Sequence, residues 1–354
     1  MNDNISLNMN KKTIKNDIFF QMITKIDGLN SVEKMKELSN NRLGILLEPQ
    51  VNLDFYPFNW GIEMRHLSPQ VLLIYSLNTF KEIYKINSDN EIFDIIELKN
   101  NDLIIDSFKG IYIYKLSKKK YELFQKINEK CISLYGLINS NLILINSEGL
   151  NIYHKKDLYI LKEHLKNTYE HYSKTIKIIE INKNKLIILN YYEYQDLNKR
   201  IGNFERIYLI LYYNIENKIK KQIRKYHNST DEVDILIKNE YLLIKDDDYL
   251  TFYNILNIED KNDINDIKTD KIHIKYFPNI YNYLYDFILI KYYKEIELYK
   301  LVNKSLEFYR NYQFDFLKEK IGLKNSKYFS IILKNNNIVI YYSNQIYVIK
   351  HLIY

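Results

Sequence analysis

The chain contains no alanine, and only 8 glycines and 4 prolines occur among its 354 residues. Alanine is the strongest helix former, so its absence from a chain rich in isoleucine and tyrosine favours strands over helices. Turns must then be built mainly from asparagine, aspartate, serine and lysine. Asparagine and aspartate suit this role, because they tolerate the left-handed backbone region and hydrogen-bond to nearby backbone. We expect an all-β chain with polar, asparagine-containing turns.

The chain also has only one cysteine and no long apolar run. Cys131 is the only cysteine, which excludes an internal disulfide and fits a reducing compartment. Residues 1–12 are polar and lack an apolar core of signal-peptide length. No apolar run approaches the roughly 18–20 residues that cross a bilayer as a helix. We therefore expect a cytoplasmic or other intracellular protein.

Motifs that carry chemistry do not occur either. No glycine-rich loop that would cradle a phosphate is present. The spacing of His154, His164 and His171 matches no zinc pattern, and a lone cysteine cannot complete a thiolate site. The acidic run 246–248 is interpreted as a turn, and residues 260–270 depart from a calcium-binding loop where an oxygen ligand and a glycine are needed. The sequence predicts no catalytic residue, no metal site and no cofactor.

A strong charge imbalance is missing as well, because the net charge of +7 arises from 51 basic and 44 acidic residues that are interleaved. This pattern favours a solvated mixed-charge surface. Binding of nucleic acid or of an acidic membrane would require the basic residues to gather on one face. Short basic clusters occur at residues 11–12, 118–120 and 218–225. The last of these could contact acidic head groups, or could be the solvated face of a strand.

Residues 92–127 show what the chain does contain. They form four short apolar runs separated by polar turns, at residues 92–98, 103–106, 110–116 and 121–127. Runs of this length and composition, bounded by asparagine, aspartate, serine and glycine, are typical of strands joined by tight turns. The stretch therefore predicts one antiparallel four-stranded meander.

The rest of the chain repeats this unit. The expected strands of the other units are 32–38, 43–47, 71–77 and 80–86; 131–137, 142–145, 149–153 and 158–165; 175–181, 186–189, 207–213 and 218–224; 233–237, 242–244, 249–256 and a weak fourth strand obscured by residues 259–271; 272–276, 287–290, 296–301 and 306–314, with residues 278–285 inserted; and 328–333, 338–341 and 346–352. Seven units are predicted, and the last one lacks a fourth strand.

A spare strand at the other end of the chain can supply the missing one. Residues 17–26 resemble the fourth strand of the unit, although Phe19, Met22, Ile23 and Ile26 would also fit helical spacing. A circular array of sheets can complete its last sheet with the N-terminal strand, and this leaves no open edge. We predict that residues 17–26 pair with residues 346–352 and close a ring.

The repeat resembles the WD40-like family of seven-bladed β-propellers, whose period of about 40–50 residues it shares. The resemblance lies in the blade pattern, since the Gly-His and Trp-Asp pairs of that family are missing and Trp60 lies in an insertion. It implies an all-β, seven-bladed β-propeller of four-stranded antiparallel blades, closed by the N-terminal strand. We expect a single propeller domain over residues 17–354 and a disordered tail over residues 1–16.

The function that this resemblance implies is a non-catalytic protein-protein interaction scaffold. The longest departures from the repeat are residues 48–69, 190–206 and 313–325, the last with the spacing of a short helix. Long loops on a rigid scaffold often carry function. The predicted partner-binding residues lie in the first departure and are Phe55, Tyr56, Phe58 and Trp60. These aromatic residues could instead fold back and cover one end of the ring.

Two other classes of function stay open. An enzyme or small-ligand binder would use the central channel, and three or more ionisable side chains converging there would favour it. A nucleic-acid or membrane binder would show its basic residues on one face.

Overall fold

A computed structural model describes residues 20–26, 29, 31–39, 41–49, 51–53, 64–66, 69–118, 120–166, 173–195, 204–227, 233–239, 241–246, 249–255, 271–273, 279–282, 287–291, 295–302, 305–313, 329–332, 337–342 and 345–351. Every regular element in these ranges is a β-strand, and all paired strands are antiparallel. Across the same ranges, no helix has the length and apolar character needed to cross a membrane. The prediction of an all-β chain is confirmed.

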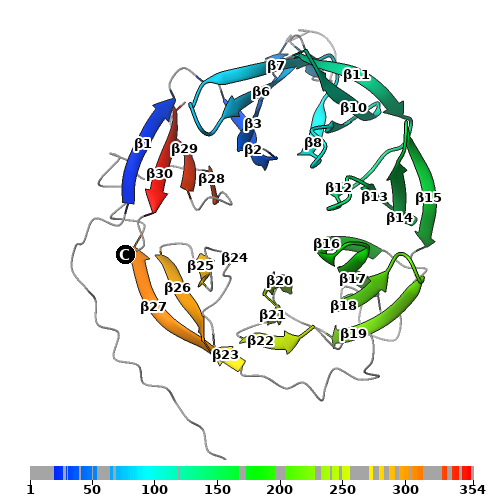
Figure 1. Ribbon diagram of the computed structural model, residues 1–354, viewed down its shortest axis with the longest axis vertical. Helices are drawn as coiled ribbons and strands as arrows, with labels where there is room; N and C mark the ends of the chain where they lie inside the picture. The colour runs from blue at the N-terminus through cyan, green and yellow to red at the C-terminus, as the bar shows by residue number, and fades with distance from the viewer. Residues whose placement is uncertain are drawn as a thin grey trace, which may run out of the picture.

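The described strands form seven four-stranded sheets and one two-stranded sheet. The four-stranded sheets are arranged as blades around a central axis, with the first strand of each blade innermost (Figure 1). Blade 1 consists of β2 (Val32–Leu38), β3 (Arg42–Leu47), β6 (Gln70–Ser76) and β7 (Glu82–Ser88). Blade 2 consists of β8 (Ile92–Glu97), β9 (Leu103–Ser107), β10 (Gly110–Ser117) and β11 (Lys120–Ile127). Blade 3 consists of β12 (Ser133–Gly136), β13 (Leu142–Asn146), β14 (Gly149–Lys155) and β15 (Tyr159–Lys166).

The other half of the ring continues the same order. Blade 4 consists of β16 (Ser173–Asn182), β17 (Lys185–Gln195), β18 (Phe204–Asn214) and β19 (Ile219–His227). Blade 5 consists of β20 (Asp234–Lys238), β21 (Tyr241–Asp246), β22 (Tyr249–Asn254) and β23 (Lys271–His273). Blade 6 consists of β24 (Asn279–Asn282), β25 (Phe287–Lys291), β26 (Glu295–Val302) and β27 (Ser305–Gln313). Blade 7 contains β28 (Phe329–Ile332), β29 (Asn337–Tyr342) and β30 (Gln345–His351).

The fourth strand of blade 7 comes from the other end of the chain. β1 (Phe20–Ile26) pairs with β30 in a register that runs from Phe20 opposite His351 to Ile26 opposite Ile346. Figure 1 shows β1 lying along the outer side of β30, next to β7 of blade 1 in the ring. The predicted closure is confirmed, and β1 is a strand and not a helix.

Two backbone features recur from blade to blade. In blades 1 to 5 the turn between the first and second strands contains a residue with positive φ, namely Asn41, Asn101, Ser140, Asn184 and Asn239. Four of these five are asparagine, the residue that tolerates this region best after glycine. The pairing of the third and fourth strands also shifts register once in each of blades 1, 2, 3, 4 and 6. Each shift is a β-bulge, which increases the local twist of the outer strand.

Glycine is used where the third strand of a blade begins. Gly110 has a φ of 120°, and a Cβ atom there would lie 2.6 Å from the carbonyl oxygen of Ile127. Gly149 occupies the same position in blade 3, with a φ of 150°. Only glycine adopts this backbone region freely, so any other residue at these two positions would strain the backbone.

The core lies between blades. Buried side chains of neighbouring blades form shared clusters for the pairs 7 and 1, 1 and 2, 2 and 3, 3 and 4, 4 and 5, and 5 and 6. The second strands are buried on both faces, as Leu103, Ile104 and Ile105 show with at most 2% exposure. Because each blade covers its faces with its neighbours, an interrupted ring would expose an apolar sheet face to water.

Polar side chains also connect neighbouring blades. Tyr159 of blade 3 donates to Asp102 of blade 2 at 2.8 Å, and Lys177 of blade 4 pairs with Asp234 of blade 5 at 2.7 Å. The hydroxyl of Tyr341 in blade 7 accepts a hydrogen bond from the backbone of Val32 in blade 1 at 3.2 Å. These bonds fix the relative height of the blades, because each joins two specific atoms.

Two predictions about the elements are wrong. Residues 272–276 were expected to start the sixth unit, whereas β23 is the fourth strand of blade 5 and β24 opens blade 6 within the expected insertion 278–285. The departure 190–206 was expected as a loop, but its two ends extend the long strands β17 and β18. The misplacement of residues 272–276 has a physical reason: a fourth strand pairs on one edge only, so a short polar segment such as β23 can form it.

The helix expected at residues 313–325 falls outside the described residues, apart from Gln313 at the end of β27. The expected tail, residues 1–16, also lies outside them.

Candidate functional site

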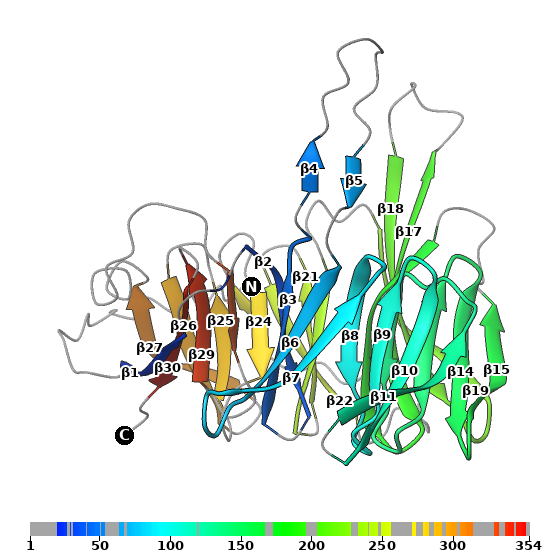
Figure 2. The same ribbon diagram turned by 90° about the horizontal axis from the view of Figure 1, so that it is seen from above.

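The two faces of the ring differ in their connections. The upper face is the side of the ring that carries the turns between the second and third strands of each blade. The lower face is the opposite side. It carries the turns between the first and second strands and between the third and fourth strands. Two hairpins extend from the upper face (Figure 2). One is formed by β4 (Val51–Leu53) and β5 (Met64–His66), which pair within the insertion of blade 1. The other is the continuation of β17 and β18 of blade 4, paired as far as Gln195 and Phe204.

Blades 2 and 3 lie between these hairpins in the ring and have short upper turns. Three large apolar side chains are exposed there: Phe93, Phe108 and Ile132, with 46%, 58% and 49% of their surface accessible. The backbone amide of Phe108 is bonded to the carbonyl of Glu91, and the ammonium of Lys130 lies 5.0 Å from the centroid of the Phe108 ring. The upper face of blades 2 and 3 therefore carries an apolar patch, which we call the Phe108 patch.

The predicted partner-binding residues fall in the sequence between the two strands of the first hairpin. Phe55, Tyr56, Phe58 and Trp60 stand between β4 and β5 in the sequence, and they lie outside the described residues. The structure places the flanking strands β4 and β5 on the upper face (Figure 2). Their role stays a prediction.

The Phe108 patch was missed from the sequence. The sequence predicts a polar turn between the apolar runs 103–106 and 110–116, and Phe108 lies within it. A phenylalanine in a two-residue turn has no strand neighbour to pack against, and this was the available signal. Phe93 and Ile132 follow the strand pattern, and their exposure depends on how blades 2 and 3 meet.

Ionisable groups gather where the first strands of blades 1 and 2, β2 and β8, lie side by side, together with Asp106 of β9 and Cys131 in the loop that follows blade 2. The carboxylate of Asp94 on β8 accepts from Lys34 at 2.8 Å and from Lys36 at 2.9 Å, both on β2. Asp106 on β9 is the cross-strand partner of Asp94, and Cys131 in the loop before β12 is hydrogen-bonded to Asp106. This convergence is the feature that would favour a catalytic or ligand-binding centre.

The pKa values of this group have clear physical causes. Burial would raise the pKa of Asp94, but Lys36 and Lys34 outweigh it and hold the pKa below its usual value. Burial lowers the pKa of Lys36. Burial also raises the pKa of Asp106 to about 6, with the nearby Asp94 carboxylate adding to the shift. The pKa of the Cys131 thiol is raised by burial and then by Asp106.

This arrangement is suited to holding blades together and poorly suited to chemistry. A nucleophilic cysteine needs a lowered pKa, and that of Cys131 is raised. The carboxyl of Asp106 has the pKa of an acid–base group, but the residue is 2% exposed, so a substrate could not reach it in this conformation. The Asp94 carboxylate is already bonded to both lysines. The one thiol in this cluster, Cys131, is hydrogen-bonded to Asp106, but its raised pKa keeps it protonated and makes it a poor nucleophile.

The other candidate ligands that the structure describes are not brought together, and His171 lies outside the described residues. His154 and His164 lie on β14 and β15, where His154 pairs with Ile160 and His164 pairs with Asn151. The Nδ1 atom of His164 is 2.6 Å from the side-chain oxygen of Asn151. Of the acidic run 246–248, only Asp246 is described, at the end of β21. Within the described part of the chain, no group of three or more histidine, cysteine or acidic side chains is arranged to hold a metal ion.

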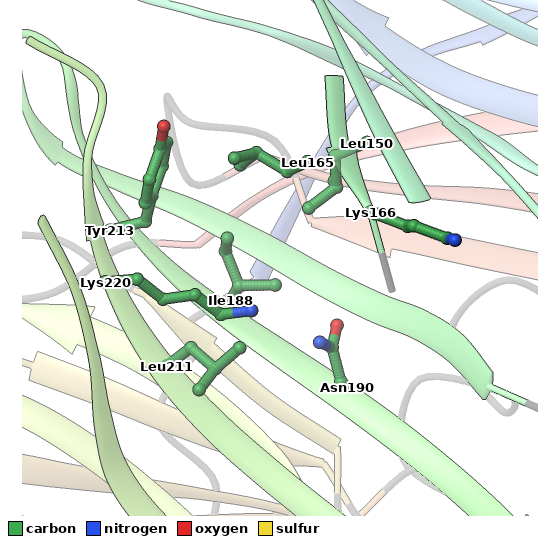
Figure 3. Close-up of a pocket in the computed structure, with 8 residues that line it drawn as sticks. All are labelled: Leu150, Leu165, Lys166, Ile188, Asn190, Leu211, Tyr213 and Lys220. Carbon is green, nitrogen blue, oxygen red and sulfur yellow. The ribbon is translucent and has the colours of Figure 1, made fainter. Parts of the chain in front are cut away.

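A small pocket lies between blades 3 and 4. It is lined by Leu150, Leu165, Lys166, Ile188, Asn190, Leu211, Tyr213 and Lys220. Figure 3 shows the Lys220 side chain extending toward Ile188, while Lys166 points outward. The cavity volume of about 20 Å³ is room for about one water molecule. Burial lowers the pKa of Lys220 here, but the space is too small for an organic ligand.

Comparison with known proteins shows similarity in structure. No protein-family model and no curated protein matches the sequence. The chain is similar to one in the crystal structure of the mitotic checkpoint complex, with a TM-score of 0.57 and 8% identity over 94% of this chain and 92% of the other. It is also similar to the AfRom2 CNH domain, with a TM-score of 0.54 and 12% identity over 95% and 99% of the two chains. The Dos1 propeller gives a TM-score of 0.50 and 8% identity over 94% and 96%.

These likenesses extend over almost the whole length of both chains. At identities of 8 to 12% they show a common fold and carry no residue roles. Together with the blade order and ring closure, they show that the chain has a WD40-like β-propeller fold.

Proposed function

We propose that this propeller is a non-catalytic interaction platform that binds protein partners on its upper face. The observation that carries the proposal is the Phe108 patch, exposed on a rigid ring between two extended hairpins. Aromatic side chains are enriched at protein interfaces, and two of the three exposed side chains of the patch are phenylalanines. The apolar patch would form the centre of the interface, and the hairpins would flank the partner.

The ionisable cluster on the inner strands supports this proposal over an enzyme. Its groups are buried or bonded to one another, and Cys131 is held as a thiol. The alternative of an enzyme or small-ligand binder in the central channel would need one of these groups to reach a substrate.

The test compares how well two double variants bind a partner protein. Both variants gain two negative charges, one in the Phe108 patch and the other on the outer strands. Phe93→Glu with Phe108→Glu places two carboxylates in the patch. The control is Leu123→Glu with Leu161→Glu, on the outer strands β11 and β15, where the two leucines are 56% and 46% exposed. Affinity capture from an extract of the native host, followed by mass spectrometry, identifies partners of the wild type. We expect binding of such a partner to weaken at least about thirtyfold in the patch variant, since an aromatic anchor contributes about 2 kcal/mol or more.

The predicted aromatic residues of the first hairpin form a second arm of this experiment. Phe58→Ala with Trp60→Ala should weaken the same partner while the melting temperature stays near that of the wild type. A large fall in melting temperature would instead show that these residues cover the ring end. Equal loss of the partner in the patch variant and in the outer-strand control would contradict the upper face as the binding surface.

A further inference from the structure

Lysine side chains gather on the lower face of blades 2 to 4. Six turns make up this surface, and five of them carry lysine: Lys99, Lys118 and Lys120 in blade 2, Lys155 and Lys156 in blade 3, and Lys183, Lys185 and Lys218 in blade 4. All of these side chains are exposed or half-buried. No ion pair joins Lys118, Lys156 or Lys218 to another described residue.

Acidic residues do not balance this charge. Asp102 is buried, and its carboxylate accepts from Tyr159 and Asn100. Only Asp157 and Glu216 are exposed acidic residues on these six turns. The upper face of blades 2 and 3 differs, because Lys109 and Lys130 are accompanied there by Asp89, Glu91, Glu129 and Glu148. The sequence favours a solvated mixed-charge surface, whereas the described turns on the lower face of blades 2 to 4 carry more lysines than acidic residues.

Aliphatic side chains are exposed among the lysines. The one turn without lysine presents Ile138, which is 43% exposed, and Leu158 stands beside Lys156 with 46% exposure. Ile219, at the start of β19, is 44% exposed and follows Lys218. The turns of blades 2 to 4 end at a similar level in Figure 2, and no hairpin extends from this side of them. The lower face of these blades therefore combines positive charge and exposed aliphatic side chains on turns from which no hairpin extends.

We propose that the lower face of blades 2 to 4 docks on an anionic lipid bilayer. Lysines near a surface of acidic lipids are attracted to it, and aliphatic side chains gain by entering the boundary between head groups and acyl chains. A nucleic acid fits the same surface less well, because single strands are bound by stacking on aromatic side chains. The exposed apolar residues on these described turns are aliphatic. Docking in this orientation turns the upper face and both hairpins away from the bilayer.

The test is co-sedimentation with phosphatidylcholine vesicles that do or do not contain phosphatidylserine. Wild type should bind the anionic vesicles and not the neutral ones, and added salt should weaken binding because it screens the lysines. Lys118→Gln with Lys156→Gln and Lys218→Gln removes one charge from each blade. Each lysine near the surface contributes about a fivefold increase in partition, so the triple variant should bind about a hundredfold more weakly.

A matched control removes the same charge elsewhere. Lys85→Gln with Lys126→Gln and Lys162→Gln alters three exposed lysines on the outer strands β7, β11 and β15. This variant should keep most of the vesicle binding. Ile138→Ser with Leu158→Ser should weaken the vesicle binding that remains at high salt, because that binding comes from the aliphatic side chains. The melting temperature of each variant shows whether it is folded.

Three results would overturn the proposal. Equal loss in the lower-face variant and in its control would show that net charge alone matters. Displacement by soluble glycerophosphoserine would indicate a head-group pocket and not a surface. Tighter binding to a DNA duplex than to anionic vesicles would assign the face to nucleic acid. None of these results bears on the upper face, so this inference and the proposed function fail separately.

Discussion

Removal of residues 1–28 is expected to cost at least about 5 kcal/mol of unfolding free energy, because it takes away the strand that closes the ring. The register of β1 on β30 has six paired positions, and a ladder hydrogen bond contributes about 1 kcal/mol net. The deletion also leaves β30 with an open edge, which is prone to pair with other molecules. Total stabilities are about 5–15 kcal/mol, so the shortened protein should be largely unfolded or aggregated.

Chemical unfolding followed by circular dichroism measures this effect. Removal of residues 1–16 alone is the matched control, since it keeps β1 and takes away only the segment that the sequence predicts to be a disordered tail. The control should unfold at the same denaturant concentration as the full chain. A shortened chain without β1 that kept full stability would show that the ring does not depend on its N-terminal strand.

Replacement of Arg42 by leucine is the second change with a large expected effect. Glu97 is a carboxylate at the end of β8 whose side chain is fully buried. Arg42 at the start of β3 forms an ion pair with it, and Tyr121 of β11 donates to the same oxygen at 2.6 Å. The other oxygen of Glu97 is buried without a hydrogen-bond partner among the described residues. Loss of the arginine would leave a buried charge without a cation, at a cost of about 3–5 kcal/mol.

The pH dependence and a double variant separate this cause from lost packing. Burial raises the pKa of Glu97 in the native state, and Arg42 counteracts the rise. A group whose native pKa lies above its unfolded value contributes stability at low pH that is lost as the pH rises. The deficit of Arg42→Leu should therefore be smaller near pH 5 than near pH 8. Arg42→Leu with Glu97→Leu should recover at least half of the loss.

Urea titrations of the wild type, Arg42→Leu, Glu97→Leu and the double variant at both pH values supply these numbers. Additive losses in the double variant, or a deficit independent of pH, would contradict the role of an unpaired carboxylate. The result would then point to the contact of the Arg42 guanidinium with the ring of Tyr84, which lies 5.7 Å away.

The ring could be predicted from sequence because its strands repeat. Leu103 and its equivalents recur at blade-length intervals, and the spare strand before residue 28 accounts for the missing one at the end. Blades 5 and 6 were divided wrongly, because β23 has only three residues and two of them are Lys271 and His273. A fourth strand pairs on one edge and contacts solvent, so apolar alternation does not identify it.

The ends of β17 and β18 were read as a loop for a related reason. Beyond the blade, both faces of a hairpin meet water, and polar residues such as Glu193 and Arg206 then fit a strand as well as a loop. The bulges in the fourth strands were also missed, because an extra residue at one position leaves the overall pattern of a short strand unchanged.

The candidate sites differ in how far sequence could reveal them. The lysines of the lower face follow from the predicted strand order, since turns between first and second and between third and fourth strands share a face. The clusters 118–120 and 218–225 are visible in the sequence as separate basic segments, but that their lysines share one face with those of blade 3 follows only once the turns are placed together. The Phe108 patch could not be predicted in the same way, because the exposure of its side chains depends on how blades 2 and 3 pack against each other.

Ring closure is the claim on which both proposed faces depend, and a cross-link tests it directly. Gln21 and Lys350 are paired across β1 and β30, so cysteines at these positions should lie within about 7 Å, the reach of a disulfide. Oxidation of Gln21→Cys with Lys350→Cys should give a cyclic chain that migrates faster on a non-reducing gel. Gln21→Cys with Tyr347→Cys is the control, because three residues along a strand separate the thiols by about 10 Å. A cross-link in the control and none in the paired positions would contradict the closed ring.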